Sequence, residues 1–254
     1  MHNETIVLTM AGASKRFADA GYRLPKYMLT AHGHSVFSWA AMSLLNFVSE
    51  DGQFICVCRK DHGISTFVRE ELCSLGVSSS NVEVVQLDGP TDGQATTALG
   101  ARSVIRNPDR PVLIYNIDTY CDPSALRPDS VRGAGWIPCF SAPGSSWSFA
   151  ESDEDGKVTR VVEKERISDD CTLGLYWFRS LDVFVSAYED TYSRGEKGAV
   201  ERYIAPIYNS LVAGGMPVYI ERVDSSCVTP IGTPAEYEAF RRSSPPAFLR
   251  RGER

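Results

Sequence analysis

The sequence predicts a single α/β domain, with a mainly parallel twisted sheet, helices on both faces and a Rossmann-like N-terminal half. Short apolar runs alternate with longer stretches of helical spacing, which is the pattern of strand–helix units. The length of 254 residues fits one such domain. No repeat, linker or low-complexity stretch divides the sequence, so we expect the domain over residues 1–242. A basic tail is expected over residues 243–254, where Pro245 and Pro246 favour disorder.

Four segments of the N-terminal half are expected to form strands: Ile6–Thr9, Phe54–Cys58, Val82–Leu87 and Val112–Tyr115. The first and the last of them are expected to be buried. Apolar residues at helical spacing predict helices over Val36–Val48, Thr66–Leu75 and Thr96–Ile105. Strands and helices that alternate at this rhythm give a parallel sheet, in which ligands bind beyond the carboxyl ends of the strands. The residues that follow each strand are therefore the first candidates for a site.

The C-terminal half is less regular but continues the α/β pattern. Further strands are expected at Ala134–Ser141, Trp147–Glu151, Lys157–Glu163, Leu173–Phe178 and Val218–Val223, and helices at Ser180–Asp190 and Ala199–Ala213. The dipeptide Asp155-Gly156 is typical of a turn, and it separates two of these strands. All the expected strands can therefore belong to one sheet.

The bulk composition excludes several classes of protein. A net charge of −6 argues against a binder of duplex nucleic acid, which normally carries a basic stripe. No run approaches the roughly 18 apolar residues that span a bilayer, and the first residues do not have the pattern of a signal peptide. Seven cysteines at irregular spacing, without a CxxC pair, favour reduced and mostly buried thiols. We therefore expect a cytoplasmic protein with no nucleic-acid or membrane partner.

The loop after the first strand combines small and basic residues. Ala11, Gly12, Ala13 and Ser14 would let backbone N–H groups approach phosphate oxygens, and Lys15, Arg16 and Lys26 would add positive charge. The spacing matches neither a P-loop nor a GxGxxG fingerprint. Taken alone, the loop fits a phosphate cradle and a strand-to-helix turn with solvated bases equally well.

The pattern Ala-Gly-x-Ser-x-Arg-Phe with Pro-Lys following resembles the signature loop of the nucleotidylyltransferases that activate sugar phosphates and related alcohols. The resemblance implies that Arg16 contacts the leaving pyrophosphate and that Lys26 steadies the α-phosphate. It also implies a nucleotide-diphospho-sugar transferase fold.

Two later segments resemble the rest of the donor site of that family. Thr91 to Thr97 is similar to the loop that reads the nucleotide base, which assigns base contacts to Asp92, Gly93, Gln94 and Thr97. Asn116-Ile117-Asp118 ends a buried strand where the family places its metal-binding Asp, so Asn116 and Asp118 are expected beside the nucleotide. One carboxylate together with substrate phosphates is the usual way to hold Mg²⁺, the cofactor expected on Asp118. The alternative for Asp118 is a structural role in capping a turn.

The acceptor half of the site is implied by a second group of residues. Glu163 and Lys164, followed by Gly174 and Tyr176, resemble the segments in which the family's Glu receives sugar hydroxyls and its Lys meets the acceptor phosphate. Without the family, Glu163 and Lys164 would be interpreted as a solvated pair at the end of a strand.

The resemblance covers roughly residues 5 to 240 and is strongest to a subgroup associated with capsule and other surface-polysaccharide gene sets. It rests on several short motifs in the same order: Arg16-Phe17, Ala20-Gly21-Tyr22, Trp147-Ser148-Phe149-Ala150, Ile167-Ser168, Tyr203, Pro206 to Asn209, and Gly232-Thr233-Pro234.

Two departures from the family pattern matter. Many sugar-phosphate members place a second metal-binding Asp two residues before the Gly-Thr turn, where this chain has Pro230. A proline side chain cannot bind a metal, so a second ion would need Asp224 or the substrate phosphates. The first loop is also shorter than the Gly-Gly-x-Gly-Thr-Arg loop of the thymidylyl and glucose-1-phosphate enzymes. It is closer to that of cytidylyltransferases, which favours CTP as the donor.

The resemblance thus predicts transfer of NMP from an NTP to a phosphorylated acceptor such as a sugar 1-phosphate, with Arg16, Lys26, Asp118 and Lys164 as catalytic residues. The four histidines match no triad spacing and are expected to be non-catalytic. One alternative is a glycosyltransferase of the related fold, although its usual Asp-x-Asp reads Asn116-Ile117-Asp118 here. Another is a catalytically inactive nucleotide-binding regulatory protein, which only Pro230 favours.

Overall fold

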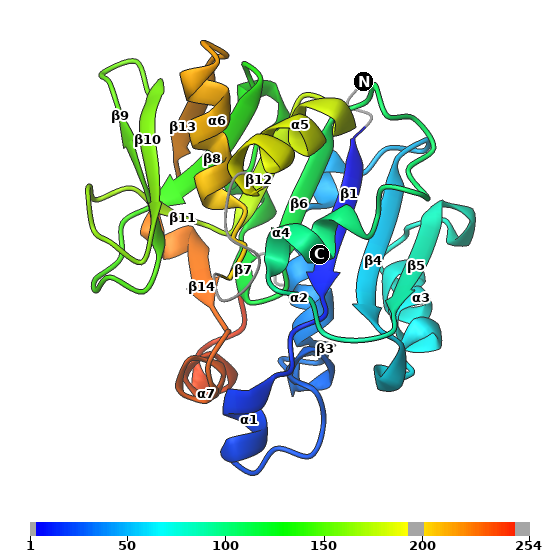
Figure 1. Cartoon of the computed structure of the whole chain (residues 1–254). Helices are drawn as coiled ribbons and strands as arrows, with labels where there is room; N and C mark the ends of the chain where they lie inside the picture. Colours follow the sequence, from blue (N-terminus) through cyan, green and yellow to red (C-terminus); the bar gives the residue numbers. More distant parts are fainter. Residues whose placement is uncertain (1–3, 193–200, 247–254) are drawn as a thin grey trace.

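A computed structural model describes residues 4–192 and 201–246, and its centre is a ten-stranded sheet. The N-terminal half of this sheet is parallel, in the order β6-β1-β4-β5 (Figure 1). These strands are β1 (Thr5–Met10), β4 (Gln53–Arg59), β5 (Val82–Leu87) and β6 (Val112–Asn116). All four were predicted from their apolar runs, and β5 has the predicted limits.

The C-terminal half of the sheet is mostly antiparallel. It follows the order β10-β9-β11-β8-β12, with β12 antiparallel to β6 and β13 parallel to β8. Its strands are β8 (Gly135–Phe140), β9 (Ser148–Ser152), β10 (Val158–Glu163), β11 (Cys171–Thr172), β12 (Leu175–Phe178) and β13 (Val218–Arg222). The predicted fold class, a single α/β domain that is Rossmann-like in its N-terminal half, is confirmed.

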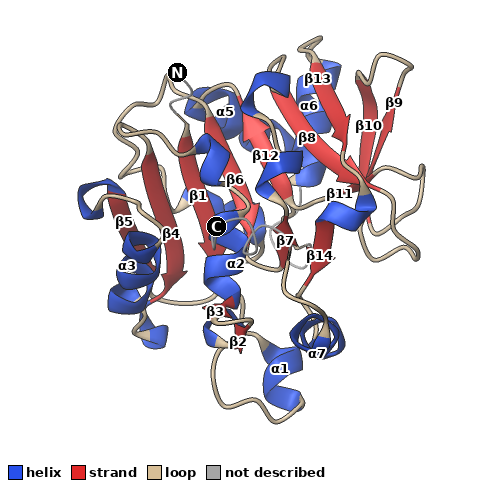
Figure 2. Ribbon diagram, turned by 180° about the vertical axis from the view of Figure 1, so that it is seen from behind, coloured by secondary structure: helices blue, strands red, loops and turns tan. Residues whose placement is uncertain are grey.

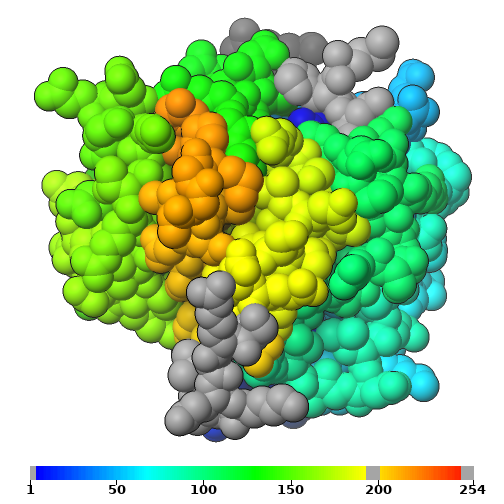
Figure 3. Space-filling view, turned by 45° about the horizontal axis from the view of Figure 1, so that its top comes forward, coloured from blue at the N-terminus to red at the C-terminus, as the bar shows by residue number. Residues whose placement is uncertain are grey.

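Helices cover both faces of the sheet because the side chains of each strand alternate between two apolar layers. In β1, Ile6 and Leu8 pack in one layer and Val7 in the other. The first layer is covered by α2 (Val36–Met42) and α3 (Ser65–Ser74), which Figure 2 shows from behind. The second is covered by α4 (Gln94–Leu99), α5 (Leu181–Tyr192) and α6 (Tyr208–Ala213). In the space-filling view α5 and α6 lie side by side over this face (Figure 3).

Beyond the carboxyl end of β1, the first and last helices of the described chain pack together. These are α1 (Lys15–Asp19) and α7 (Pro234–Arg242), which lie below the sheet in Figure 1. The rings of Phe17 and Tyr237 are 6.2 Å apart, and the Tyr22 hydroxyl donates a 2.9 Å hydrogen bond to Glu238. Two small sheets complete the fold, β2 (Thr30–Ala31) with β3 (His34–Ser35), and β7 (Thr119–Cys121) with β14 (Val228–Pro230). The packing of α1 against α7 anchors the loop that follows β1 to the C-terminal part of the chain.

Three helices are shorter than the sequence predicts. The helix expected over Val36–Val48 ends at Met42, where the Ser43 hydroxyl bonds back to Trp39 and also accepts the N–H of Cys121. The helix expected over Thr96–Ile105 ends at Leu99, because Gly100 has a low helix propensity and the following turns close with shorter-range hydrogen bonds. Both helix ends depend on local contacts that the apolar periodicity of the sequence does not reveal.

The helix expected over Ala199–Ala213 begins later than predicted. A short 3₁₀ helix over Ala205–Ile207 contains Pro206, and α6 starts only at Tyr208. The first two residues of the prediction, 199 and 200, lie outside the described residues. The predicted tail over 243–254 stays a prediction, because only residues 243–246 of it are described.

The composition led to predictions about the cysteines and about membrane-spanning segments. All seven cysteines are free, and five of them are buried. Within residues 4–192 and 201–246, no helix is long and apolar enough to cross a membrane.

Candidate active site

The carboxyl ends of β1 and β6 lie next to each other at one edge of the sheet, because the two strands are parallel and in register. Thr9 pairs with Asn116, and the Thr9 hydroxyl donates to the Tyr115 carbonyl at 3.3 Å. The Gln94 side chain reaches the same point and donates to the Thr9 hydroxyl at 3.2 Å. Three segments that the sequence singled out thus meet where ligands bind in such sheets.

Lys26 and Asp118 form an ion pair at this edge. Lys26 opens a 3₁₀ helix after Pro25, and its Nζ donates to Oδ1 of Asp118. The Lys26 side chain is only 15% exposed, and that of Asp118 is 34% exposed. The Asp118 carbonyl accepts the N–H of Ile231 at 2.7 Å, so the backbone beside the carboxylate is held in place. The structure therefore brings together the cation and the carboxylate that the sequence assigned to the donor half.

The arrangement around Asp118 fits a magnesium ion held by a single protein carboxylate and substrate phosphates. Among the residues that the structure describes, no group of three or more His, Cys, Asp or Glu side chains could hold a metal ion by itself. Pro230 pairs with Thr119 and so lies next to Asp118 without offering a ligand. Asp224 accepts the N–H of Ser226 at 2.8 Å, so its carboxylate caps a 3₁₀ helix.

The loop after β1 presents open backbone beyond the edge of the sheet. Gly12 and Ala13 are exposed, Ala11 is buried, and nothing lies within 4 Å of the point where a Gly12 Cβ would be. Ser14 has a left-handed backbone with φ 49°, and its hydroxyl is buried without a hydrogen-bond partner in the described structure. A buried hydroxyl without a partner is costly, so a ligand oxygen there would satisfy it.

The two basic residues of that loop lie on α1. Lys15 donates to Asp19 one turn further along the helix, at 2.9 Å, and both side chains are more than half exposed. This contact matches the solvated-base interpretation of Lys15. Arg16 is exposed, so its side chain is open to a ligand.

The loop predicted to read the base is held closed by its own threonines. The hydroxyls of Thr91 and Thr97 are 2.6 Å apart, and each lies 3.0 Å from the Gly93 carbonyl, so the two hydroxyls and this carbonyl share a small hydrogen-bonded cluster. The loop also lies against Arg202. A Cβ on Gly93 would be 2.3 Å from the Arg202 carbonyl, so only glycine allows this approach.

The residues predicted for the acceptor half include a largely buried carboxylate at the end of β10. Glu163 accepts a hydrogen bond from the Ser148 hydroxyl, and burial raises the pKa of its carboxyl above the ordinary value. Tyr176 lies nearby, buried, and shares a 3.0 Å hydrogen bond with Thr172; burial raises its pKa as well. Such a site can receive hydroxyl groups of an acceptor.

Lys164, directly after β10, has a left-handed backbone conformation. Its φ is 57°, and its Nζ donates to the Tyr203 hydroxyl and lies 3.8 Å from a carboxylate oxygen of Glu201. The Tyr203 hydroxyl and nearby carboxylates raise the pKa of Lys164, so the side chain stays cationic. The Lys164 side chain is 55% exposed, which leaves it available to an acceptor phosphate.

Gly174 joins the acceptor half to the donor half. Its carbonyl accepts the N–H of Asn116, and a Cβ at this position would be 2.2 Å from the Asn116 side chain. Two chains of contacts therefore connect predicted residues at this edge of the sheet. One joins Gln94 and Asn116 through Thr9, and Gly174 contacts Asn116. The other joins Asp92 and Lys164 through the adjacent residues Arg202 and Tyr203.

Sequence reasoning missed the contacts that the 201–203 segment makes with Asp92 and Lys164. Tyr203 was noted only as part of a resemblance, and Arg202 was not noted at all. Arg202 belongs to no motif of its own, so only its ion pair with Asp92, at 3.1 Å, shows its role.

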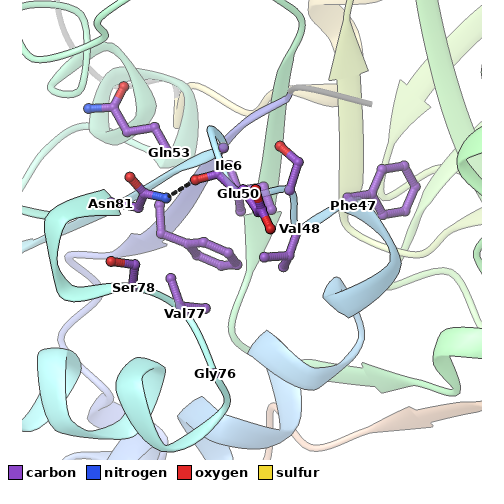
Figure 4. Close-up of a pocket in the computed structure, with 12 residues that line it drawn as sticks. Ile6, Phe47, Val48, Glu50, Gln53, Gly76, Val77, Ser78 and Asn81 are labelled. Atoms are coloured by element: carbon purple, nitrogen blue, oxygen red, sulfur yellow. Dashed lines mark hydrogen bonds between the residues drawn. The ribbon is translucent and has the colours of Figure 1, made fainter. Parts of the chain in front are cut away.

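A cavity of about 340 Å³ lies at the opposite edge of the sheet (Figure 4). It is lined by the amino ends of β1 and β4, around Ile6 and Gln53, and by Asn81, whose side chain donates to the Glu50 carbonyl at 2.7 Å. None of the site residues predicted from the sequence lines it. Its position does not match that of ligands in sheets of this kind, so it is not the candidate active site.

The histidines of the described chain have structural contacts. The Tyr27 hydroxyl and His62 Nδ1 are 2.8 Å apart, His32 Nε2 bonds the Phe240 carbonyl, and His34 packs edge-on against Trp39. These contacts agree with a non-catalytic role; His2 lies outside the described residues.

Solved structures of nucleotidyltransferases resemble this chain. A nucleoside-diphosphate-sugar pyrophosphorylase from Vibrio cholerae RC9 is 32% identical, with a TM-score of 0.87, and the match covers 94% of this chain and 100% of that chain. An inositol-1-phosphate CTP transferase from T. maritima is 17% identical, with a TM-score of 0.74 and coverage of 94% and 93%. A Bacillus anthracis chain described as a glucose-1-phosphate thymidylyltransferase, in complex with a sucrose, is 15% identical, with a TM-score of 0.72 and coverage of 94% of each chain. No family model and no curated protein matches the sequence.

Proposed function

The chain belongs to the family of nucleotidyltransferases that includes nucleoside-diphosphate-sugar pyrophosphorylases, and on that premise we propose its reaction. It transfers NMP from an NTP, with CTP the favoured donor, to a phosphorylated acceptor such as a sugar 1-phosphate, and it releases pyrophosphate. This family membership supports neither alternative considered from the sequence, a glycosyltransferase or an inactive regulatory protein.

The Lys26–Asp118 ion pair carries the proposal for the donor half. A triphosphate at the edge of the sheet would meet the amine of Lys26, the open backbone at Gly12 and Ala13, and the exposed Arg16. Lys26 neutralises charge on the α-phosphate, and Arg16 neutralises charge on the leaving pyrophosphate. Mg²⁺, held by Asp118 and the phosphates, would supply further charge neutralisation.

The acceptor half supplies orientation. Lys164 stays cationic and half-exposed, which suits a phosphate monoester, and Glu163 with Ser148 suits the hydroxyls of a sugar or polyol. An oxygen of the acceptor phosphate attacks the α-phosphorus in line, and the bond to the pyrophosphate oxygen breaks. The attacking oxygen is already ionised at neutral pH, so the reaction needs no general base.

The preference for CTP rests on the short Ala-Gly-Ala-Ser form of the first loop. A neighbour of the same fold is named as a CTP transferase for inositol 1-phosphate, which is compatible with that donor and with acceptors other than sugars. The resemblance to the surface-polysaccharide subgroup supports a product that serves as an activated precursor for such a polymer.

The experiment that tests this function measures pyrophosphate release with each of the four NTPs and a panel of phosphorylated sugars and polyols. Lys26→Ala is expected to lower turnover about 100-fold, because a phosphate-neutralising cation is lost in the transition state. Lys157→Ala is the matched control, since it removes an exposed lysine at the far end of the strand that leads to Glu163. Unchanged turnover in Lys26→Ala would refute the assignment of the donor half.

A further inference from the structure

The segment of residues 201–203 contacts both halves of the candidate site. Arg202 bonds the loop predicted to read the base, and the next residue, Tyr203, bonds the lysine predicted to meet the acceptor phosphate. We call this segment the clasp. Adjacent residues of one strand-like segment thus hold two loops that are about 70 positions apart in the sequence.

Arg202 bridges the base loop to α5. Its Nε lies 3.1 Å from Oδ2 of Asp92, and its NH1 donates to the Tyr188 hydroxyl at 2.5 Å. The Tyr188 hydroxyl is also 3.0 Å from the Thr96 hydroxyl in the same loop. The Arg202 side chain is 26% exposed, and its guanidinium lies over the rings of Tyr188 and Tyr192. A planar guanidinium can stack on these rings while its fixed fork of donors serves both partners, a geometry that an ammonium lacks.

The backbone of the clasp reinforces this bridge. The Arg202 N–H donates to the Asp92 carbonyl at 2.8 Å, and the Arg202 carbonyl accepts the N–H of Ala95 at 2.9 Å. The two bonds pair the clasp with the base loop in both directions. Movement of the clasp would therefore move Asp92 and Gly93.

Tyr203 fixes the other half. Its hydroxyl accepts a hydrogen bond from Nζ of Lys164 and donates one to Glu201, and its ring lies 4.4 Å from the Lys164 amine. Its carbonyl accepts a 2.6 Å hydrogen bond from the Tyr192 hydroxyl on α5. Arg202 and Tyr203 thus both contact tyrosines of α5.

We infer that Arg202 and Tyr203 are positioning residues that set the base loop and Lys164 relative to each other, so that the clasp joins the donor and acceptor halves. The inference rests on the proposed function, because it assigns the two loops to the two substrates. Arg202 acts through Asp92 on nucleotide binding, and Tyr203 acts through Lys164 on acceptor binding.

Steady-state kinetics that separate the two substrates test the inference. Arg202→Met is expected to raise the KM for the NTP about tenfold with kcat at saturating NTP unchanged, because the loop loses a charged partner. Tyr203→Phe removes only the hydroxyl and is expected to raise the acceptor KM about fivefold, with the NTP KM unchanged. Arg202→Lys keeps the charge but not the planar fork of donors, so it should restore part of the NTP affinity.

A double-mutant cycle identifies the partner of Arg202. If Arg202 acts through Asp92, then Asp92→Asn and Arg202→Met together are no worse than the stronger single variant. Fully additive effects would overturn the inference, as would an Arg202→Met variant with an unchanged KM for the NTP. Thermal melting of each variant shows whether the protein is folded under assay conditions.

Direct NTP binding by calorimetry separates the inference from the proposed function. Absence of turnover in the wild type with every NTP and acceptor pair would refute the proposed function, and the clasp is then judged by binding alone. Weaker NTP binding in Arg202→Met than in the wild type supports the inference, and equal binding refutes it.

Discussion

Lys26 and Asp118 are 92 positions apart in the sequence and form an ion pair beyond the carboxyl ends of β1 and β6. Each is mostly buried, so neither is a freely solvated surface charge. Both residues lie in segments that follow parallel strands at the same edge of the sheet, so the fold brings their side chains together. The pair is the basis for the first of four predictions.

Asp118→Asn is expected to lower kcat about 100-fold while the protein stays folded, because the carboxylate proposed to hold Mg²⁺ is lost but the side-chain shape is kept. The dependence of activity on Mg²⁺ concentration should shift to higher concentrations in the variant. Titration of Mg²⁺ at saturating substrates measures this shift. Wild-type activity and an unshifted Mg²⁺ curve would exclude Asp118 as a metal ligand.

Ser14→Gly is expected to stabilise the folded protein by about 1 kcal/mol, because glycine adopts a left-handed backbone without the steric cost that a side chain brings. The substitution also removes a buried hydroxyl that has no partner in the described structure. Urea unfolding measures the change in stability. If the hydroxyl binds a phosphate oxygen, the same variant should bind NTP more weakly, so stability and affinity should change in opposite directions.

The stability of the protein should depend on pH through Glu163. Burial raises the pKa of this carboxyl above the unfolded value of 4.5, so the folded state binds its proton more tightly than the unfolded state does. The contribution of Glu163 is therefore most favourable below pH 4.5 and is lost as the pH rises through the folded pKa.

Glu163→Gln removes this titration and keeps a group that can accept the Ser148 hydrogen bond. We expect the variant to melt at a higher temperature than the wild type at pH 7, and the difference to shrink at pH 4. Melting curves at the two pH values check the sign. A variant that melts below the wild type at pH 7 would show that the ionised carboxylate stabilises the fold. Weaker acceptor binding is expected in the same variant.

Gly174→Ala should disturb the junction between the two halves of the site. Its Cβ would lie 2.2 Å from the Asn116 side chain, and its φ of 84° disfavours any side chain. We expect a loss of stability of about 2 to 4 kcal/mol, because overpacking adds to backbone strain. Gly144→Ala is the matched control, since Gly144 has a similar φ of 85° and open space around it. Equal losses in both variants would show that contact with Asn116 is unimportant.

Strands of the parallel half could be predicted closely where they are short apolar runs bounded by polar residues, as at Phe54–Cys58. The limits of the helices could not be predicted as closely. The hydroxyl of Ser43 and the backbone of Gly100 end two helices, although the apolar periodicity of the sequence continues beyond those points. The antiparallel pairing of β12 with β6 was also not predicted, because an apolar run does not reveal the direction of its neighbour.

The sequence by itself determined which residues end the strands and therefore which of them reach the edge where ligands bind. It also placed small residues after β1 and basic and acidic residues after later strands, and these predicted a phosphate-binding site in two halves only together with the family resemblance. Only the tertiary structure decided that Lys26 meets Asp118 and that Arg202 bonds Asp92. The physical reason is that such pairs form between segments far apart in the chain, and strand order and loop packing, rather than residue spacing, set which charges become neighbours.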